Sequence, residues 1–232
     1  MNSKILFIGN SITQGKLGIN FVDMIKHRYP NFIYYNKGKG RETLLEVIKR
    51  LIKTLKDDSD QYSFIVIEVG HNDILLPHIK QKWPFMNVKQ VTPVSDIGIL
   101  LEKMLKTVLT LTNAKIILTT LSCIGETFNS QLNHERRLIN EQIKRVGHNC
   151  NAYIADVSTI FDNIIVSSSS SSYLINNPLN LLVDYFRSKK PKRADKISIR
   201  RNLSLTIDGV HLNSQGAKIY CRVLSEFLDN LV

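Results

Sequence analysis

The chain has 232 residues, of which 43% are hydrophobic and 22% are charged. This length and composition suit a single α/β domain over residues 1–232 with a substantial core, and they exclude a disordered chain. No apolar run approaches the roughly 20 residues of a membrane helix. We also expect no signal peptide, because the apolar run over residues 5–8 is far too short for one, and we therefore expect a cytoplasmic protein.

The formal net charge of +11 is unevenly distributed. Within residues 187–201, eight basic residues face one acid, Asp195, so this stretch carries a net +7. The eight are Arg187, Lys189, Lys190, Lys192, Arg193, Lys196, Arg200 and Arg201. Such a run indicates an anionic partner, which is a substrate, a membrane surface or a nucleic acid. The alternative is a solvated, mobile loop with no partner.

The three cysteines, Cys123, Cys150 and Cys221, lie far apart in the sequence. They form neither a CxxC pair nor a zinc-binding spacing. No candidate base lies next to any of them, so we expect reduced core thiols and neither a metal site nor a catalytic cysteine.

Short apolar runs alternate with segments of helical periodicity along most of the chain. Strands are predicted over residues 4–8, 32–35, 64–69, 115–119 and 152–157. Helices are predicted over residues 21–29, 44–55, 97–111, 135–147 and 213–231. This alternation predicts a parallel sheet with helices on both faces.

Three segments interrupt the pattern. Residues 77–93 and 121–128 have no clean period and are predicted as loops over the carboxyl edge of the sheet. Residues 162–204 contain six consecutive serines, an apolar stretch over 174–186 that could form a short helix, and the basic run. We interpret 162–204 as an insertion. Within it, we expect Ser167 to Arg201 to be a mobile, basic lid or docking segment outside the core. The alternative is a simple connector.

Small polar clusters follow the predicted strands, where ligands of open α/β sheets bind. Ser11 follows the first strand, Gly38 and Gly40 the second, and Asn72 the third, while Asp208 and His211 precede the last helix. Each cluster alone has a structural explanation as a turn, a helix cap or a satisfied core histidine.

Together the clusters contain every group that acyl transfer requires. Ser11 is a candidate nucleophile, His211 a base that takes its proton, and Asp208 a partner that holds the imidazole. The Ser11 N–H, a glycine-loop N–H and the Asn72 amide are candidate donors to an oxyanion. The segment 167–201 ends just before Asp208, so we expect its far end near this site, where the apolar stretch could cover an acyl group.

Four motifs resemble the SGNH hydrolases, also called GDSL-type esterases and lipases. They are Ile8-Gly9-Asn10-Ser11-Ile12-Thr13, Asn36-Lys37-Gly38-Lys39-Gly40, Val69-Gly70-His71-Asn72-Asp73 and Asp208-Gly209-Val210-His211. The resemblance implies a flavodoxin-like three-layer fold with sheet order 2-1-3-4-5. It also implies ester hydrolysis through an acyl-enzyme without a metal or organic cofactor. The family roles fall on Ser11, His211 and Asp208 as catalytic residues, and on Ser11, Gly40 and Asn72 as the oxyanion hole.

Two positions depart from the family pattern. Asn10 stands where the family usually has Asp, which removes a charge but keeps the hydrogen-bonding shape. Arg41 stands where the family's oxyanion glycine often lies, so Gly40 is favoured over Gly38 as the donor, and the Arg41 N–H is a further candidate.

The leading hypothesis is a serine esterase acting on an O-acetyl or short acyl group, plausibly on a carbohydrate. Acyl-thioesters and lysophospholipids are also compatible with the family. Two alternatives stay open: transfer of the acyl group to a sugar, and a catalytically silent binder that holds a polyanion through residues 187–201.

Overall fold

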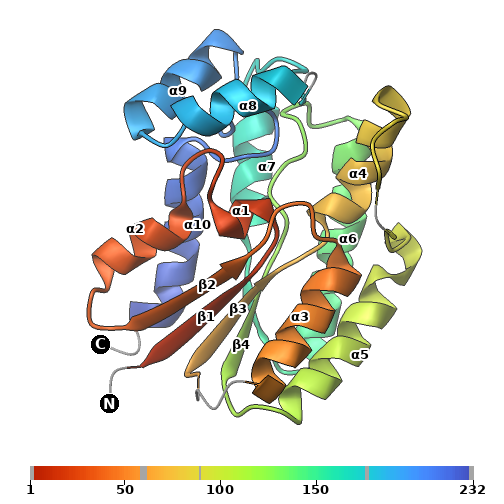
Figure 1. The fold of residues 1–232 in the computed structure, drawn as a ribbon, viewed down its shortest axis with the longest axis vertical. Coiled ribbons are helices and arrows are strands. Elements are labelled where there is room, and N and C mark those ends of the chain that lie inside the picture. The colour runs from red at the N-terminus through yellow and green to blue at the C-terminus, as the bar shows by residue number, and fades with distance from the viewer. Residues whose placement is uncertain (1–2, 58–61, 89, 176–177, 230–232) are drawn as a thin grey trace.

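A parallel five-stranded sheet forms the centre of the molecule (Figure 1). The structure is a computed structural model that describes residues 3–57, 62–88, 90–175 and 178–229. The strands are β1 Lys4–Gly9, β2 Ile33–Gly38, β3 Phe64–Glu68, β4 Lys115–Thr119 and β5 Tyr153–Ala155. Their order is β2-β1-β3-β4-β5, so the predicted α/β fold and sheet order are confirmed.

The register of the sheet brings the ends of three strands level. Gly9 at the end of β1 pairs with Gly38 of β2 on one side and with Glu68 of β3 on the other. Because all strands are parallel, the segments that follow these residues leave the sheet at the same edge. The motifs after β1, β2 and β3 are therefore neighbours in space.

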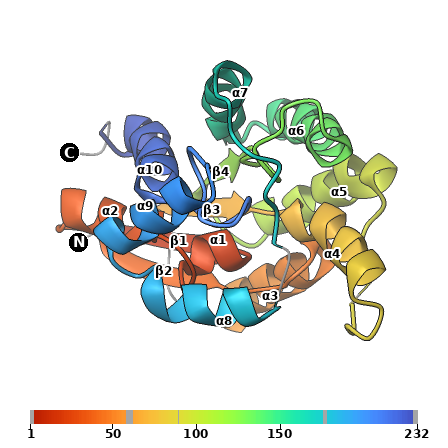
Figure 2. The same cartoon turned by 90° about the horizontal axis from the view of Figure 1, so that it is seen from above.

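Helices cover both faces of the sheet (Figures 1 and 2). Those of the first half are α1 Ser11–Gln14, α2 Phe21–Arg28, α3 Leu44–Asp57, α4 His71–Lys82, the 3₁₀ turn η1 Val94–Asp96 and α5 Ile97–Leu109. Those of the second half are α6 Gln131–Asn149, α7 Val157–Ser167, α8 Pro178–Arg187, α9 Pro191–Arg200 and α10 Ser214–Leu228.

Aromatic contacts tie α2, α7 and α10 into one layer. Tyr220 of α10 stacks on Phe21 of α2, with ring centroids 4.8 Å apart, and meets Phe161 of α7 edge-on at 6.0 Å. Phe21 in turn packs against Phe7 of β1 at 6.1 Å. The helices α3, α5 and α6 form the layer on the opposite face of the sheet (Figure 2).

The predicted loop over residues 77–93 is wrong in its first part. α4 continues through Pro77 to Lys82, and irregular backbone begins only at Trp83. Leu75, Leu76 and Ile79 are buried along this helix. The free energy gained by burying these side chains outweighs the loss of the helix hydrogen bond that proline removes. The sequence pattern alone does not show this balance.

The segment 162–204 is more ordered than predicted. Residues 162–167 complete α7, and the basic run forms α9 rather than a loop. The carboxylate of Asp184 in α8 is buried. It accepts hydrogen bonds from Nη1 and Nη2 of Arg201, at 2.6 and 3.1 Å. Ile175 and Ala194 belong to the buried core, so the prediction that this segment lies outside the core is wrong. That it is an insertion stays a prediction.

The cysteines are free, as predicted, although only Cys123 and Cys221 are buried while Cys150 is half-buried. Burial raises the pKa of Cys123 well above its usual value, which keeps that thiol protonated. None of the helices that the structure describes is both long and apolar enough to cross a bilayer.

Candidate active site

Ser11 is the first residue of α1, directly beyond the end of β1. Asn10 caps this short helix, because its side-chain oxygen accepts a hydrogen bond from the Ile12 N–H at 2.9 Å. The strand and the cap together orient the Ser11 side chain at the carboxyl edge of the sheet.

A hydrogen-bonded chain runs from Ser11 to a buried carboxylate. The Ser11 hydroxyl lies 3.0 Å from Nε2 of His211, and Nδ1 of His211 lies 2.7 Å from Oδ2 of Asp208. Burial by itself raises the pKa of Asp208. The neighbouring His211 and the hydrogen bonds from the His211 and Val210 N–H groups have the larger combined effect, so the pKa of Asp208 lies below its ordinary value. An ionised Asp208 only accepts, so Nδ1 carries the proton and Nε2 is left to accept from Ser11.

Glu126, in the loop after β4, anchors the segment that leads to Asp208. Its buried carboxylate accepts hydrogen bonds from three successive N–H groups, those of Ser204, Leu205 and Thr206, at 2.6 to 2.9 Å. It also accepts from the hydroxyls of Thr206 and Ser170. An acceptor-only group therefore meets five donors, and this holds residues 204–206 in place.

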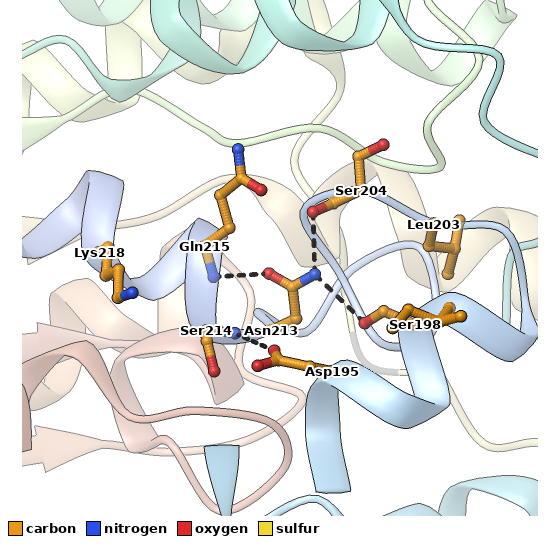
Figure 3. A pocket seen from close by; sticks show the side chains of 9 residues that line it. Asp195, Ser198, Leu203, Ser204, Asn213, Ser214, Gln215 and Lys218 are labelled. Carbon is orange, nitrogen blue, oxygen red and sulfur yellow. Dashed lines mark hydrogen bonds between the residues drawn. The ribbon is translucent and has the colours of Figure 1, made fainter. Parts of the chain in front are cut away.

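Asn213, which precedes α10, also holds this segment at Ser204 (Figure 3). Its amide donates to the Ser204 carbonyl at 2.9 Å, and its oxygen accepts from two N–H groups at the start of α10. These side chains line a polar hollow of about 530 Å³. The hollow shares no lining residue with the cavity at Ser11, so its contribution to the site is to hold the backbone beside His211.

The glycine motif after β2 has two different glycines. A Cβ atom at Gly38 would lie 2.2 Å from the backbone nitrogen of Gln14, so the close approach of β2 to α1 requires glycine. The Gly38 N–H already donates to Asn36 at 2.9 Å. A Cβ atom at Gly40, in contrast, would lie 3.8 Å from the Ser11 Cβ, and Gly40 lines the cavity at Ser11.

Arg41 occupies a conformation that favours glycine. Its φ angle is +65°, in the left-handed region that other residues adopt less readily. The side chain is held at the surface by a hydrogen bond from its guanidinium to the Asn87 carbonyl at 2.9 Å. The family's frequent glycine at this place is therefore explained by backbone geometry, which Arg41 adopts at some conformational cost.

Asn72 lies in the first turn of α4 and is buried. One hydrogen of its amide is directed to the Glu42 carbonyl, at 2.8 Å. The side chain of Glu42 is paired with Arg50, whose Nη2 also reaches the Gly9 carbonyl at 3.1 Å. An amide has two hydrogens, so the Glu42 bond uses only one of them, and Asn72 lines the same cavity as Ser11.

A buried polar network lies beneath Ser11 and explains the asparagine at position 10. The Asn10 amide donates to Glu68 at 2.8 Å, and Thr13 donates to the other oxygen of the same carboxylate. Nδ1 of His71 lies 2.7 Å from Oε1 of Glu68, the oxygen that also accepts from Asn10. An ionised aspartate at position 10 would set two carboxylates against each other, whereas Asn10 supplies the donor that Glu68 needs.

A cavity of about 450 Å³ opens beside Ser11. Its polar lining comes from the segments around Ser11 and Gly40, from Asn72 and from His211, while the remainder is apolar. The apolar lining residues are Leu17, Leu75, Leu76, Ile79, Trp83, Met86, Ile175, Leu181, Leu182 and Tyr185. Within the described residues, no group of three or more histidine, cysteine, aspartate or glutamate side chains is arranged to hold a metal ion.

A model of the GDSL-like lipase/acylhydrolase family matches residues 5–222, which is nearly the whole chain. The chain belongs to this family. The fold and the ester-hydrolase class implied by the sequence resemblance are therefore confirmed. A search of curated proteins gave no significant match.

Solved structures similar to this family member share its fold at low sequence identity. The acetyl xylan esterase AlAXEase matches with a TM-score of 0.66 at 16% identity, covering 97% of this chain and 99% of the other. A G-D-S-L family lipolytic protein from Veillonella parvula has a TM-score of 0.65 at 16% identity, covering 98% of each chain. A catalytic mutant of Axe2, an acetylxylan esterase from Geobacillus stearothermophilus, has a TM-score of 0.63 at 18% identity, covering 97% and 94%.

The structure brings together all five residues that the sequence selected for the site: Ser11, Gly40, Asn72, Asp208 and His211. Sequence reasoning missed Glu126, because nothing in the local pattern around it indicates what it faces. The apolar stretch over residues 174–186 was expected to lie near the site, and its residues Leu181, Leu182 and Tyr185 line the cavity at Ser11. Asp73 was considered only as a possible cap of its own helix. It caps a different one.

Asp73 joins three segments near the site. One carboxylate oxygen accepts from the Leu44 N–H at the start of α3, and the other accepts from the Thr92 N–H, both at 2.8 Å. Burial raises the pKa of Asp73 to about 6, although the hydrogen bonds from Thr92 and Leu44 oppose this shift. The folded protein therefore binds a proton at Asp73 at pH values where the unfolded chain has released it.

This raised pKa predicts a pH-dependent stability. The contribution of Asp73 is fully present below its unfolded pKa of about 3.9 and is lost as the pH rises through about 6. We expect the free energy of unfolding of wild type, relative to Asp73→Asn, to fall between pH 4 and pH 6 and then level off in urea titrations. The control is Asp96→Asn, which makes the same chemical change at an exposed position. A difference that grows with pH would mean that the two N–H groups stabilise the ionised form.

Proposed function

We propose that this chain is a serine esterase that hydrolyses a carboxylic ester through an acyl-enzyme. The observation that carries the proposal is the continuous chain from the Ser11 hydroxyl through His211 to the ionised Asp208, with links of 3.0 and 2.7 Å. Membership of the acylhydrolase family supports the same reaction class.

The proposed reaction has two halves. Ser11 Oγ attacks the ester carbonyl carbon while Nε2 of His211 takes the hydroxyl proton, and Asp208 stabilises the resulting imidazolium. Collapse of the tetrahedral intermediate breaks the bond to the alcohol, which leaves with the proton from His211. A water molecule then repeats the sequence on the acyl-enzyme and releases the acid and Ser11.

The proposed oxyanion donors are the N–H groups of Ser11 and Gly40 and the side-chain amide of Asn72. Gly40 is favoured over Gly38 because the Gly38 N–H already has an acceptor in Asn36. The contacts of Glu42 support this assignment, since its carbonyl orients Asn72 and its paired carboxylate holds the loop that carries Gly40.

For the substrate, the first candidate is an O-acetyl or short acyl group on a carbohydrate. Its support is the likeness in fold to proteins described as acetyl xylan esterases. Transfer of the acyl group to a sugar uses the same acyl-enzyme and differs only in the acceptor.

A second candidate role is the binding of an anionic partner by α9. Arg187, Arg193, Lys196 and Arg200 line a hollow of about 370 Å³, and none of its described lining residues is acidic. α9 lies beside α8, which lines the cavity at Ser11 (Figures 1 and 2). The basic surface is therefore placed to attract anionic substrates toward the site, or to hold a polyanion.

The first test of the proposed function is Ser11→Ala. Loss of the nucleophile is expected to lower kcat for p-nitrophenyl esters by about 10⁴- to 10⁶-fold. The variant should unfold at the wild-type temperature, because Ser11 is not in the core, and a fluorophosphonate should label wild type at Ser11 but not the variant. Turnover within tenfold of wild type would contradict the assignment.

Replacement of Asn72 tests the oxyanion hole. Asn72→Ala is expected to lower kcat by roughly 10²- to 10³-fold with little change in KM, since the lost donor acts in the transition state. The lost bond to Glu42 also affects stability, so the thermal unfolding of the variant is measured alongside. A higher KM with unchanged kcat would make Asn72 a substrate-binding residue instead.

The basic surface is tested by salt. In a variant carrying Arg193→Gln, Lys196→Gln and Arg200→Gln, kcat/KM for an anionic ester should fall about threefold or more at 0.1 M salt. The difference should vanish near 1 M, where the Debye length shrinks from about 10 Å to about 3 Å. The control replaces Lys49, Lys53 and Lys56 of α3 by Gln, which changes the net charge equally. If both variants behave alike, the position of the charge has no role in steering.

A further inference from the structure

We propose that the cavity beside Ser11 is an acyl-chain site, so that the preferred ester carries a medium-length acyl group, of roughly eight carbons, rather than acetyl. The inference rests on the proposed function of Ser11 and specifies the substrate of that same site. It is carried by the shape and lining of the cavity, and it differs from the carbohydrate O-acetyl candidate.

The first observation is the size of the cavity. Its volume is about 450 Å³. A heavy atom of a flexible chain occupies about the volume of a water molecule in the liquid, roughly 30 Å³. The cavity therefore has room for about fifteen heavy atoms, and the two carbons of an acetyl group would leave most of it unfilled. A site that binds by burying apolar surface gains little from so small a group.

The second observation is that two separate segments supply apolar walls to the cavity. Leu75, Leu76 and Ile79 of α4 form one wall, which Trp83 and Met86 continue. Leu181, Leu182 and Tyr185 of α8, with Ile175, form the other. These walls come from segments about a hundred residues apart in the sequence, so their common apolar character is not a property of one amphipathic helix.

The third observation is that the polar lining gathers around Ser11. Gln14 and Lys16 follow Ser11 closely in the chain, and Arg41 follows Gly40, whereas the walls from α4 and α8 offer only the Tyr185 hydroxyl and the Trp83 ring nitrogen. A sugar ring in the apolar part would leave its hydroxyl groups without partners, which is unfavourable. The alcohol part of the ester therefore belongs at the polar end, and the acyl chain belongs between α4 and α8.

The α8 wall is held in place rather than left free. Asp184 of α8 is paired with Arg201 by two hydrogen bonds, and the hydroxyl of buried Ser188 accepts from the Gly18 N–H at 2.9 Å. The Ile175 N–H donates to the carbonyl of Asp208 itself, at 2.9 Å. The wall is thus attached to the segment that carries His211, and a chain bound against it would be held in register with the reacting carbonyl.

The test is chain-length selectivity. With p-nitrophenyl esters from acetate to dodecanoate, kcat/KM of wild type should rise about fourfold per added methylene up to about eight carbons, which is the gain for burying one methylene. Acetylated xylooligosaccharides, measured in the same series, should be poorer substrates than the octanoate. Acetate or the acetylated sugar as the best substrate would overturn the inference.

A matched pair of variants tests where the acyl chain binds. Leu182 lines the cavity but is 58% exposed, so Leu182→Asp should fold, and it should lower the ratio of kcat/KM for the octanoate to kcat/KM for the acetate about tenfold or more. The control is Val183→Asp, next to it on α8, because Val183 is 44% exposed and does not line the cavity. Equal effects of the two variants on kcat/KM for the octanoate would overturn the placement of the acyl chain.

A second variant approaches from the opposite wall. Leu76→Phe adds volume to the α4 side, so the best acyl-chain length should become shorter by about two or more carbons. An unchanged optimum in a variant with wild-type thermal unfolding would count against the acyl site. These results are distinct from failure of the proposed function itself. In that case no ester of any length is hydrolysed and a fluorophosphonate does not label Ser11, and both proposals fall together.

Discussion

The site depends on one long-range constraint: His211 must lie within hydrogen-bond distance of a serine that is 200 residues away in the chain. The sheet fixes the position of Ser11, because the register of β1 with β2 and β3 places this residue at the shared carboxyl edge. Glu126 helps to fix the position of the segment that leads to His211. Its carboxylate binds three backbone N–H groups just before Asp208, and so it couples the loop after β4 to the segment that carries the proposed base.

Buried charges recur around the site, and each is matched by several donors. Glu68 meets Asn10, Thr13 and His71, and Glu126 meets five donors. Such groups contribute little net stability compared with apolar replacements, but they leave very few alternative arrangements that satisfy every donor. The main contribution of these buried groups is therefore to hold the side chains and backbone of the site in one arrangement. The asparagine at position 10 illustrates the point, because its amide suits the neighbouring carboxylate in a way that an aspartate would not.

The cavity divides into a polar end and an apolar end, and the two have different origins in the chain. The polar end is built from the turns that follow β1 and β2, which belong to the sheet. Most of the apolar end is built from α4 and from α8, which lies in the segment where the sequence pattern was weakest. The Asp184–Arg201 pair joins α8 to the rest of the fold. The helix α4 contributes to both ends, because it carries the proposed oxyanion donor Asn72 as well as apolar lining residues.

The sequence by itself determined the sheet and the proposed catalytic groups. Short apolar runs closed by small polar residues predicted the strands, and their alternation with helices predicted a parallel sheet, because these signals are local. The order of the strands followed only from the resemblance of the four motifs to the SGNH hydrolases. The four motifs identified Ser11, Gly40, Asn72, Asp208 and His211 because they too are local signals. Tertiary structure alone decided that α4 continues through Pro77, that Glu126 holds the segment before Asp208, and that Asp73 caps α3. Each of these depends on the free energy of contacts between residues distant in the chain, and periodicity shows which side chains are apolar or charged but not which surface each one meets.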